Sequence, residues 1–160
     1  MIDILYLLTE SGNIEKSISS KISIAAMHTI KCYVQINKFS KSWATSIYNN
    51  LKEVQTAISS NKNLFKLLSE KDIISENKMY IISLAIDETK SDKRKIQMYY
   101  EVFRSTFNTY SFVYDLNKVK NVIDGLITNS FLPDNRKKEF LEINESIYNG
   151  KDNTWYITVF

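Results

Sequence analysis

The spacing of apolar residues along the chain changes once, near Lys78. Before Lys78, apolar side chains recur every three or four residues, which is the period of an amphipathic α-helix. The longest such stripe runs from Ile14 to Ile36. Shorter stretches with the same pattern are residues 4–8, which end near Gly12, residues 43–58 and residues 64–68. The first part of the chain, residues 1–77, is therefore predicted to be helical.

After Lys78 the apolar residues alternate with a period of two, which is typical of half-buried β-strands. The alternation is clearest in the series Ile96, Met98, Tyr100 and Val102. Residues 80–86 and 110–114 show the same alternation and are rich in β-branched and aromatic side chains. The connections between the three segments are too short for a crossover helix, so we expect an antiparallel meander.

The last part of the chain returns to helical spacing and then alternates again. Helices are predicted over residues 119–127 and 133–147, and a final strand over residues 155–160. Gly125 lies within the first of these helices, where a glycine costs roughly 1 kcal/mol of helix propensity. Pro133 suits the first turn of the second helix and Gly150 its end.

These patterns together predict a single α+β domain, residues 1–160. The sequence divides into N-terminal helices (1–77), a three-stranded antiparallel meander (79–115), and two helices with a C-terminal strand that joins the sheet (117–160).

The composition is that of an ordinary folded protein. Of the 160 residues, 44% are hydrophobic and 24% are charged, and the net charge is +3. No segment approaches the roughly 20 consecutive apolar residues that a membrane-spanning helix needs, and the first residues lack the basic start of a secretory signal. We therefore expect a cytoplasmic protein, or one exported without a cleavable signal, with no membrane partner. The excess of Lys over Arg, with many Ile and Asn, matches a low-GC genome.

The chain contains one histidine, His28, and one cysteine, Cys32. This scarcity excludes a zinc site of three or four His/Cys ligands. Because the two residues are four apart in a predicted helix, they lie on one face. They are either a chemically active pair, as a thiolate activated by an imidazole or as half of a metal site, or neighbours of the apolar stripe on a core helix. The second interpretation is favoured, because no Cys-rich signature or glycine turn accompanies the pair.

The remaining chemistry-bearing residues do not form a catalytic motif. Asp87 and Glu88 face Lys95 and Arg94 across the predicted hairpin, and Glu101 points outward. The three glycines are far apart, which excludes a glycine-rich phosphate loop. The sequence therefore predicts no catalytic residue, metal or cofactor, and favours a non-enzymatic protein over an enzyme.

Basic residues gather in two places. Four of them, Lys90, Lys93, Arg94 and Lys95, surround the predicted hairpin tip, and residues 136–138 form a second group. The first four are candidate phosphate contacts, with sheet aromatics as stacking platforms. The alternative is a solvated hairpin tip, which the absence of an RNP-like motif favours.

One face of the predicted sheet is the candidate partner-binding surface. Its side chains are partly apolar and rich in aromatic groups: Met79, Ile81, Tyr99, Glu101, Phe103 and Val113. A mixed surface of this kind marks a protein interface if it is exposed. A second helical layer over the sheet is the competing interpretation.

The leading functional hypothesis is a non-enzymatic protein-binding module, such as a small inhibitor, immunity or adaptor protein that presents this sheet face to one protein partner. The alternative is a nucleic-acid-binding domain that uses the basic hairpin tip and the sheet aromatics. A small metal-independent enzyme is the third hypothesis.

Overall fold

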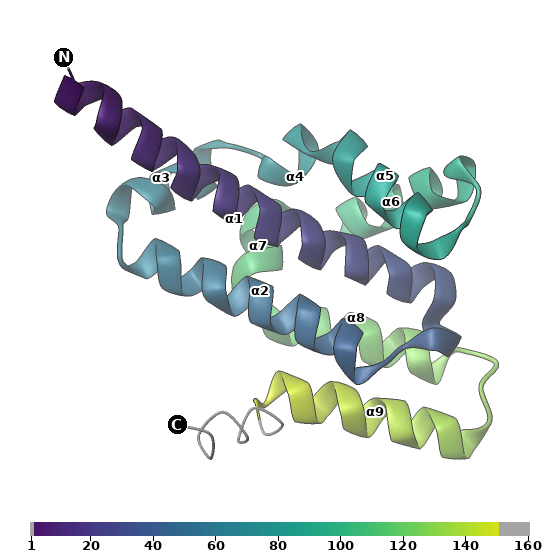
Figure 1. Cartoon of the computed structure of the whole chain (residues 1–160). Helices are drawn as coiled ribbons and strands as arrows, with labels where there is room; N and C mark the ends of the chain where they lie inside the picture. The colour runs from purple at the N-terminus through teal and green to yellow at the C-terminus, as the bar shows by residue number, and fades with distance from the viewer. Residues whose placement is uncertain (1, 151–160) are drawn as a thin grey trace.

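The computed structural model describes residues 2–150, except for the side chains of residues 2–12 and of Leu67. The described residues form nine α-helices and one short 3-10 helix, and no strand occurs among them (Figure 1). The elements are α1 Ile2–Gln35, η1 Ile36–Lys38, α2 Lys41–Ser59, α3 Lys62–Glu70, α4 Ile73–Glu76, α5 Lys78–Thr89, α6 Lys93–Thr106, α7 Thr109–Tyr114, α8 Leu116–Thr128 and α9 Asp134–Tyr148.

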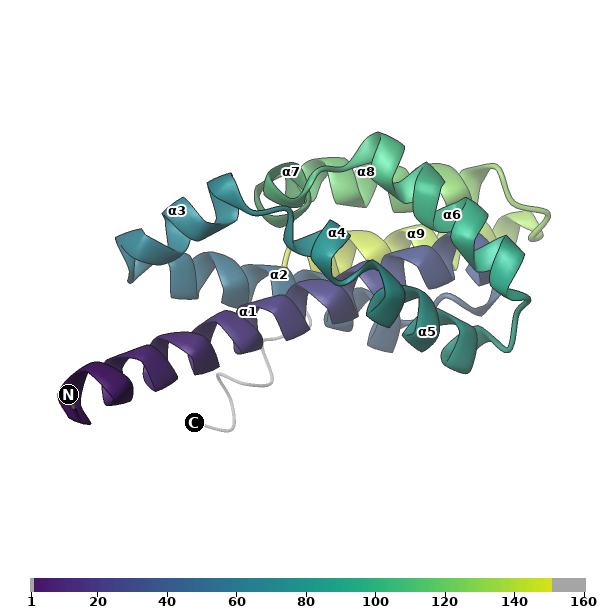
Figure 2. The ribbon, with the colours of Figure 1, turned by 90° about the horizontal axis from the view of Figure 1, so that it is seen from above.

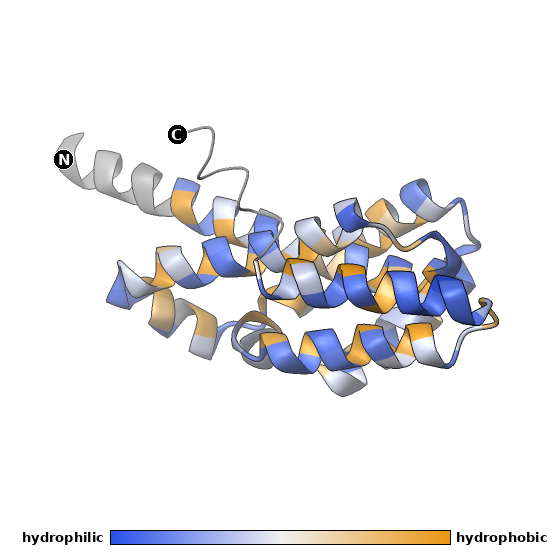
Figure 3. Cartoon of the chain, turned by 90° about the horizontal axis from the view of Figure 1, so that it is seen from below, coloured by the Kyte–Doolittle hydropathy of each residue, from blue (hydrophilic) through white to orange (hydrophobic). Residues whose placement is uncertain are grey.

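The long helix α1 is the central element of the bundle. It packs against α2 along one side and against α5 and α6 along another, while α9 packs against α2 and α8 (Figures 1 and 2). Ile22, Ala25, Ala26 and Ile30 of α1 are completely buried. A helix covered on several sides is apolar over most of its circumference, unlike a surface helix with a single stripe. The outer helices carry both hydrophobic and hydrophilic residues along their length (Figure 3).

The α+β prediction is wrong, because the segment expected to form the meander folds into α5, α6 and α7. In α6 the buried residues are Ile96, Tyr100 and Phe103, which follow helical spacing. Met98 and Val102, which the strand interpretation turns toward the core, are 53% and 40% exposed. The apolar residues of α5 and α6 are placed so that they fit both periods.

Polar residues at the expected turns begin helices instead. Asp92, predicted at the hairpin tip, caps α6 by accepting a hydrogen bond from the backbone N of Arg94 at 3.0 Å. Asn108 and Ser111 form a capping box at the start of α7, with reciprocal bonds of 2.7 and 3.1 Å. Each cap satisfies backbone N–H groups that a helix leaves unpaired at its first turn.

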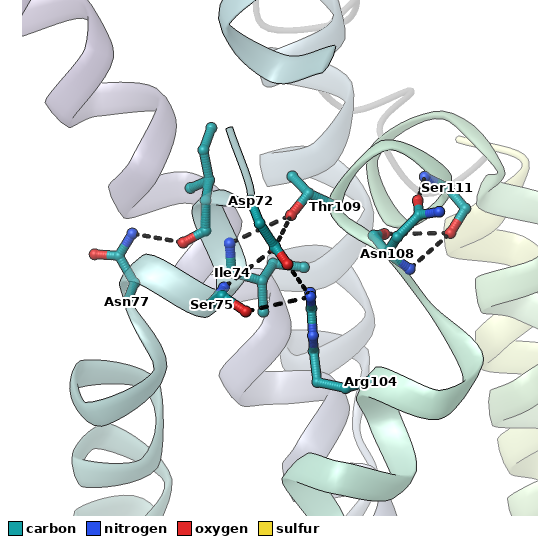
Figure 4. Close-up of polar contacts among 9 residues, drawn as sticks. Asp72, Ile74, Ser75, Asn77, Arg104, Asn108, Thr109 and Ser111 are labelled. Atoms are coloured by element: carbon teal, nitrogen blue, oxygen red, sulfur yellow. Dashed lines mark hydrogen bonds and ion pairs between the residues drawn. The ribbon is translucent and has the colours of Figure 1, made fainter. Parts of the chain in front are cut away.

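Asp72 joins α4 to α6 and α7 (Figure 4). Its carboxylate caps α4 by accepting from the Ser75 backbone N at 3.2 Å, accepts from the Thr109 hydroxyl at 2.9 Å, and pairs with Arg104. Partial burial opposes ionisation, but the hydrogen bonds from Ser75, Thr109 and Arg104 together lower the pKa of Asp72. The short helix α4 is thereby held against two later helices.

The helices predicted outside the meander are largely confirmed. Ser40 caps α2 by accepting from the Trp43 backbone N at 3.3 Å, Asp115 caps α8, and Gly150 has a positive φ of 73° directly after α9. The expected stop near Gly12 is wrong, because α1 continues through it. The predicted strand at residues 155–160 lies outside the described residues. No helix among the described residues is long and apolar enough to cross a membrane.

A buried polar network connects α2, α8 and α9. The Tyr48 hydroxyl donates to Asn144 Oδ1 at 2.5 Å, and Asn144 Nδ2 donates to Asp124 Oδ1 at 2.9 Å. Asp124 also accepts from Lys120 Nζ at 2.8 Å. Tyr48 and Asn144 are completely buried, so each bond replaces a water contact that is lost on folding. The network fixes how α9 sits on the rest of the bundle.

The Tyr48→Phe variant should be less stable by about 1–2 kcal/mol, because Asn144 Oδ1 then loses its buried donor. The free energy of unfolding in urea measures this loss. The matched control is Tyr80→Phe, since Tyr80 is exposed, and its stability should stay within about 0.5 kcal/mol of the wild type. Equal stability of the two variants would contradict a structural role for the network.

Candidate functional site

An open groove of about 790 Å³ lies between the end of α1 with η1, the helix α6, and the end of α8 with the loop that follows it. We call it the α1–α6–α8 groove. None of the side chains that line it is charged. Those used below are Tyr33, Tyr99, Val122, Gly125, Leu126 and Phe131. Its size is in the range of known ligand-binding pockets.

Aromatic side chains from two helices form one wall of the groove. The rings of Tyr33 in α1 and Tyr99 in α6 are stacked, with centroids 6.0 Å apart and an angle of 23° between the planes. Burial raises the pKa of Tyr33, so its hydroxyl is protonated at neutral pH. The wall therefore offers flat apolar surface together with neutral hydrogen-bonding groups.

Phe131 lies at the edge of the groove, in the loop between α8 and α9. Its side chain is fully exposed. A phenyl ring in this position does not stabilise the free protein, because it is not removed from water. Burial of the ring against a partner would be favourable. The sequence analysis did not identify this residue. The available signal was a pair of apolar residues, Phe131 and Leu132, in the loop predicted between two helices.

Gly125 lines the groove from within α8. A Cβ atom added there would meet nothing within 4 Å, and the residue has no positive φ. Neither the backbone conformation nor packing within the described chain therefore requires glycine at this position. Its absent side chain leaves the α8 backbone open to the groove.

The six residues predicted to bind a partner do not share one surface, because the sheet face that would gather them does not exist among the described residues. Ile81, Phe103 and Val113 are completely buried in the core. Met79 and Glu101 are exposed. The sixth, Tyr99, lines the groove. Residues two apart point to the same side of a strand but to different sides of a helix, which is why the set separates. Partner binding by the accessible members stays a prediction.

The four basic residues predicted as phosphate contacts are exposed at the α5–α6 connection. Lys90 ends α5 in the left-handed conformation, with φ 56°. The other three, Lys93, Arg94 and Lys95, occupy the first turn of α6. The hairpin that would have placed Asp87 and Glu88 opposite Lys95 and Arg94 is absent from the described chain. Glu88 instead lies 3.4 Å from Lys31, and Glu101 lies 3.2 Å from Lys78.

His28 and Cys32 lie in the part of α1 that faces the core. Complete burial raises the pKa of the Cys32 thiol to about 12, so the reactive thiolate is not formed near neutral pH. Burial, helped by Lys31 and opposed by Glu88, lowers the pKa of His28 to about 4. These environments support the core interpretation of the pair. Among the described residues, no group of three His, Cys, Asp or Glu side chains could hold a metal ion.

Protonation of His28 should make stability depend on pH. Because the pKa is lowered from 6.5 to about 4 in the folded state, the unfolded chain binds the proton more tightly. The contribution of neutral His28 to the free energy of unfolding is complete above pH 6.5 and is lost as the pH falls through 4. The total loss is about 3 kcal/mol.

The comparison of wild type with His28→Leu isolates this effect from the titrating carboxylates that both proteins share. Free energies of unfolding in urea at pH 7 and pH 4 should differ less in the variant than in the wild type. An identical pH dependence in both proteins would show that His28 is not held neutral by burial.

The Gly125→Ala variant should be more stable than the wild type by about 0.5–1 kcal/mol, because alanine has the higher helix propensity and its methyl group meets no neighbour. The free energy of unfolding in urea measures the gain. A loss of stability would mean that the space above Gly125 is not open.

Comparisons of the chain with protein-family models, with curated proteins and with solved structures find no match. Its function is therefore inferred from the groove and the residues around it.

Proposed function

We propose that this protein is a non-enzymatic protein-binding module, such as a small inhibitor, immunity or adaptor protein, and that it binds one protein partner at the α1–α6–α8 groove. The observation that carries the proposal is the fully exposed Phe131 at the edge of an uncharged groove. Aromatic anchors beside apolar depressions contribute most of the binding energy in many protein interfaces. The groove takes the place of the sheet face in the earlier hypothesis.

The lining of the groove favours binding over catalysis. Among the described residues, its polar groups are tyrosine and serine hydroxyls and asparagine amides. General acid–base chemistry most often uses imidazole, carboxylate or amine groups, and none of these lines the groove. A metal-independent enzyme is therefore the weaker hypothesis. We further propose a cytoplasmic protein, for which the lone, buried Cys32 is the supporting feature.

Nucleic-acid binding is the second candidate function. The specific observation in its favour is that Lys90, Lys93, Arg94 and Lys95 are all exposed around one helix end. Binding through phosphate contacts weakens steeply as salt rises. Protein binding that depends on an apolar anchor changes much less with salt, which separates the two candidates.

The Phe131→Ala variant tests the proposal. A partner captured from host extract by the wild-type protein is purified, and its affinity is measured by calorimetry. Removal of the ring should weaken binding at least about tenfold, equivalent to about 1.4 kcal/mol, because the apolar contact is lost while the fold is untouched.

The matched control is Phe65→Ala. Phe65 is 47% exposed and packs edge-on against Tyr110, on α3 and α7, so it does not line the groove. Its removal should leave the affinity unchanged. Equal affinities of wild type and Phe131→Ala would overturn the proposal. Retention of RNA or DNA alone, with affinity falling steeply between 50 and 200 mM salt, would favour the second candidate.

A further inference from the structure

Helix α8 carries two apolar stripes, and the described helices bury only one of them completely. Val119, Ile123 and Ile127 are completely buried in the core. The second stripe lines the groove and consists of Val122 and Leu126 with Gly125 between them, and it is continued by the polar residue Asn129, which caps the end of α8. The spacing of this stripe, i, i+3, i+4 and i+7, is the one that packs against another helix. Val122 and Leu126 are partly buried against the core, and they also line the α1–α6–α8 groove.

The opposite wall of the groove is also helical. It is formed by the last turn of α1 and by η1, through Tyr33, Val34 and Asn37. All three line the groove at the point where α1 gives way to the 3-10 helix. A slot with helical walls on two sides fits a third helix, because helices in bundles pack side chains into the spaces between those of their neighbours.

Gly125 sets how closely an occupant approaches. No neighbour comes within 4 Å of its missing Cβ, so a side chain of the occupant can rest on the α8 backbone. Glycine is used where a second backbone or a ligand approaches closely. Nothing in the described part of the chain makes use of this space.

The segments that connect the helices at one end of the molecule, residues 36–41, 90–95 and 133–138, contain more basic than acidic side chains; the acidic ones are Asp92 and Asp134. The end of α1, the α5–α6 loop and the α8–α9 loop lie at the same end of the molecule (Figures 1 and 2). Lys38 follows the groove residue Asn37, and Lys95 precedes Tyr99 by one helical turn; both lysines are exposed. The first turn of α6 contains three basic residues and no acidic one, although the helix dipole favours negative charge there. Acidic side chains brought by a partner would be stabilised at this end.

From these observations we infer that the occupant of the α1–α6–α8 groove is an amphipathic helix of a partner protein, which packs its apolar side over Gly125 and carries acidic residues beside that side. The inference rests on the proposed function of the groove and adds the chemical class of the partner. Acidic flanks would speed association and select among competing helices, while the apolar contact would supply most of the affinity.

The experiment selects helical peptides on the complete protein. The displayed library has Leu, Ile, Phe or Met at positions of an i, i+3, i+4, i+7 stripe, and Glu, Gln or Lys in equal amounts at the flanking positions. Selection should enrich Glu at the flanks. Enriched peptides should bind Gly125→Leu at least tenfold more weakly than wild type, since the leucine side chain fills the space above α8.

Asn117→Leu is the matched control, because Asn117 is exposed in the first turn of α8 and does not line the groove, and it should bind within threefold of the wild type. Circular dichroism with thermal unfolding shows that both variants are folded. The charge contribution is tested with Lys38→Glu/Lys95→Glu, which should lose affinity for Glu-flanked peptides at least tenfold. Lys62→Glu/Lys66→Glu, on α3 at the other end of the bundle (Figure 1), should bind as the wild type does.

Several results would overturn the inference. They are enrichment of Gln or Lys at the flanks, affinities that Gly125→Leu leaves unchanged, and occupation of the groove by a second copy, seen as a dimer that Gly125→Leu dissociates. A natural partner that needs Phe131 but tolerates Gly125→Leu would remove the helix inference and leave the proposed function intact. A partner insensitive to Phe131→Ala would remove the proposed function itself.

Discussion

The burial of α1 on several sides is the constraint on which the rest of the structure depends. Ala25 and Ala26 are completely buried on neighbouring sides of this helix, and their small side chains allow the helices on both sides to approach closely. Lys31 of α1 is also buried, and its ammonium lies 4.4 Å from the Trp43 ring centre and 3.4 Å from a carboxylate oxygen of Glu88. The desolvation of the amine is offset by these two contacts.

The position of the groove follows from this arrangement. Helix α1 ends in η1 at the same end of the bundle as α8, so Tyr33 faces the second stripe of α8 across open space. Helix α9 cannot cover that stripe, because Asn144 holds it to α8 through Asp124 and Lys120. The walls of the groove are thus parts of packed helices, while Phe131 lies on a loop at its edge. Rigid walls keep the ordering cost of binding low.

Sequence periodicity predicted the helices where apolar residues recur at helical spacing alone, and failed where they also recur at every second position. In α2 the buried positions Ile47, Leu51 and Val54 repeat at helical spacing, with polar residues between them. In α5, the strand pattern turns Tyr80 toward the core and Ile81 away from it, whereas the helix exposes Tyr80 and buries Ile81. The difference between helix and strand propensity in such a segment is too small to select one structure. Packing against α1 and the cap at Asp92 therefore select the helix. Because these segments are helices, the residues of the candidate sheet face do not share one surface. Of those six residues, Tyr99 alone lines the groove.

The sequence by itself determined which chemistry is scarce and that a glycine lies within the helix of residues 119–127. These properties depend on residue identity and on neighbours within one or two turns. Tertiary structure alone decided which apolar residues are buried and that Tyr33, Tyr99 and Phe131 surround one groove. Burial depends on contacts between segments far apart in the chain, and hydrophobic attraction has no direction of its own. An apolar pattern therefore indicates that a residue tends to be buried, while the packing of the helices decides which residues it contacts.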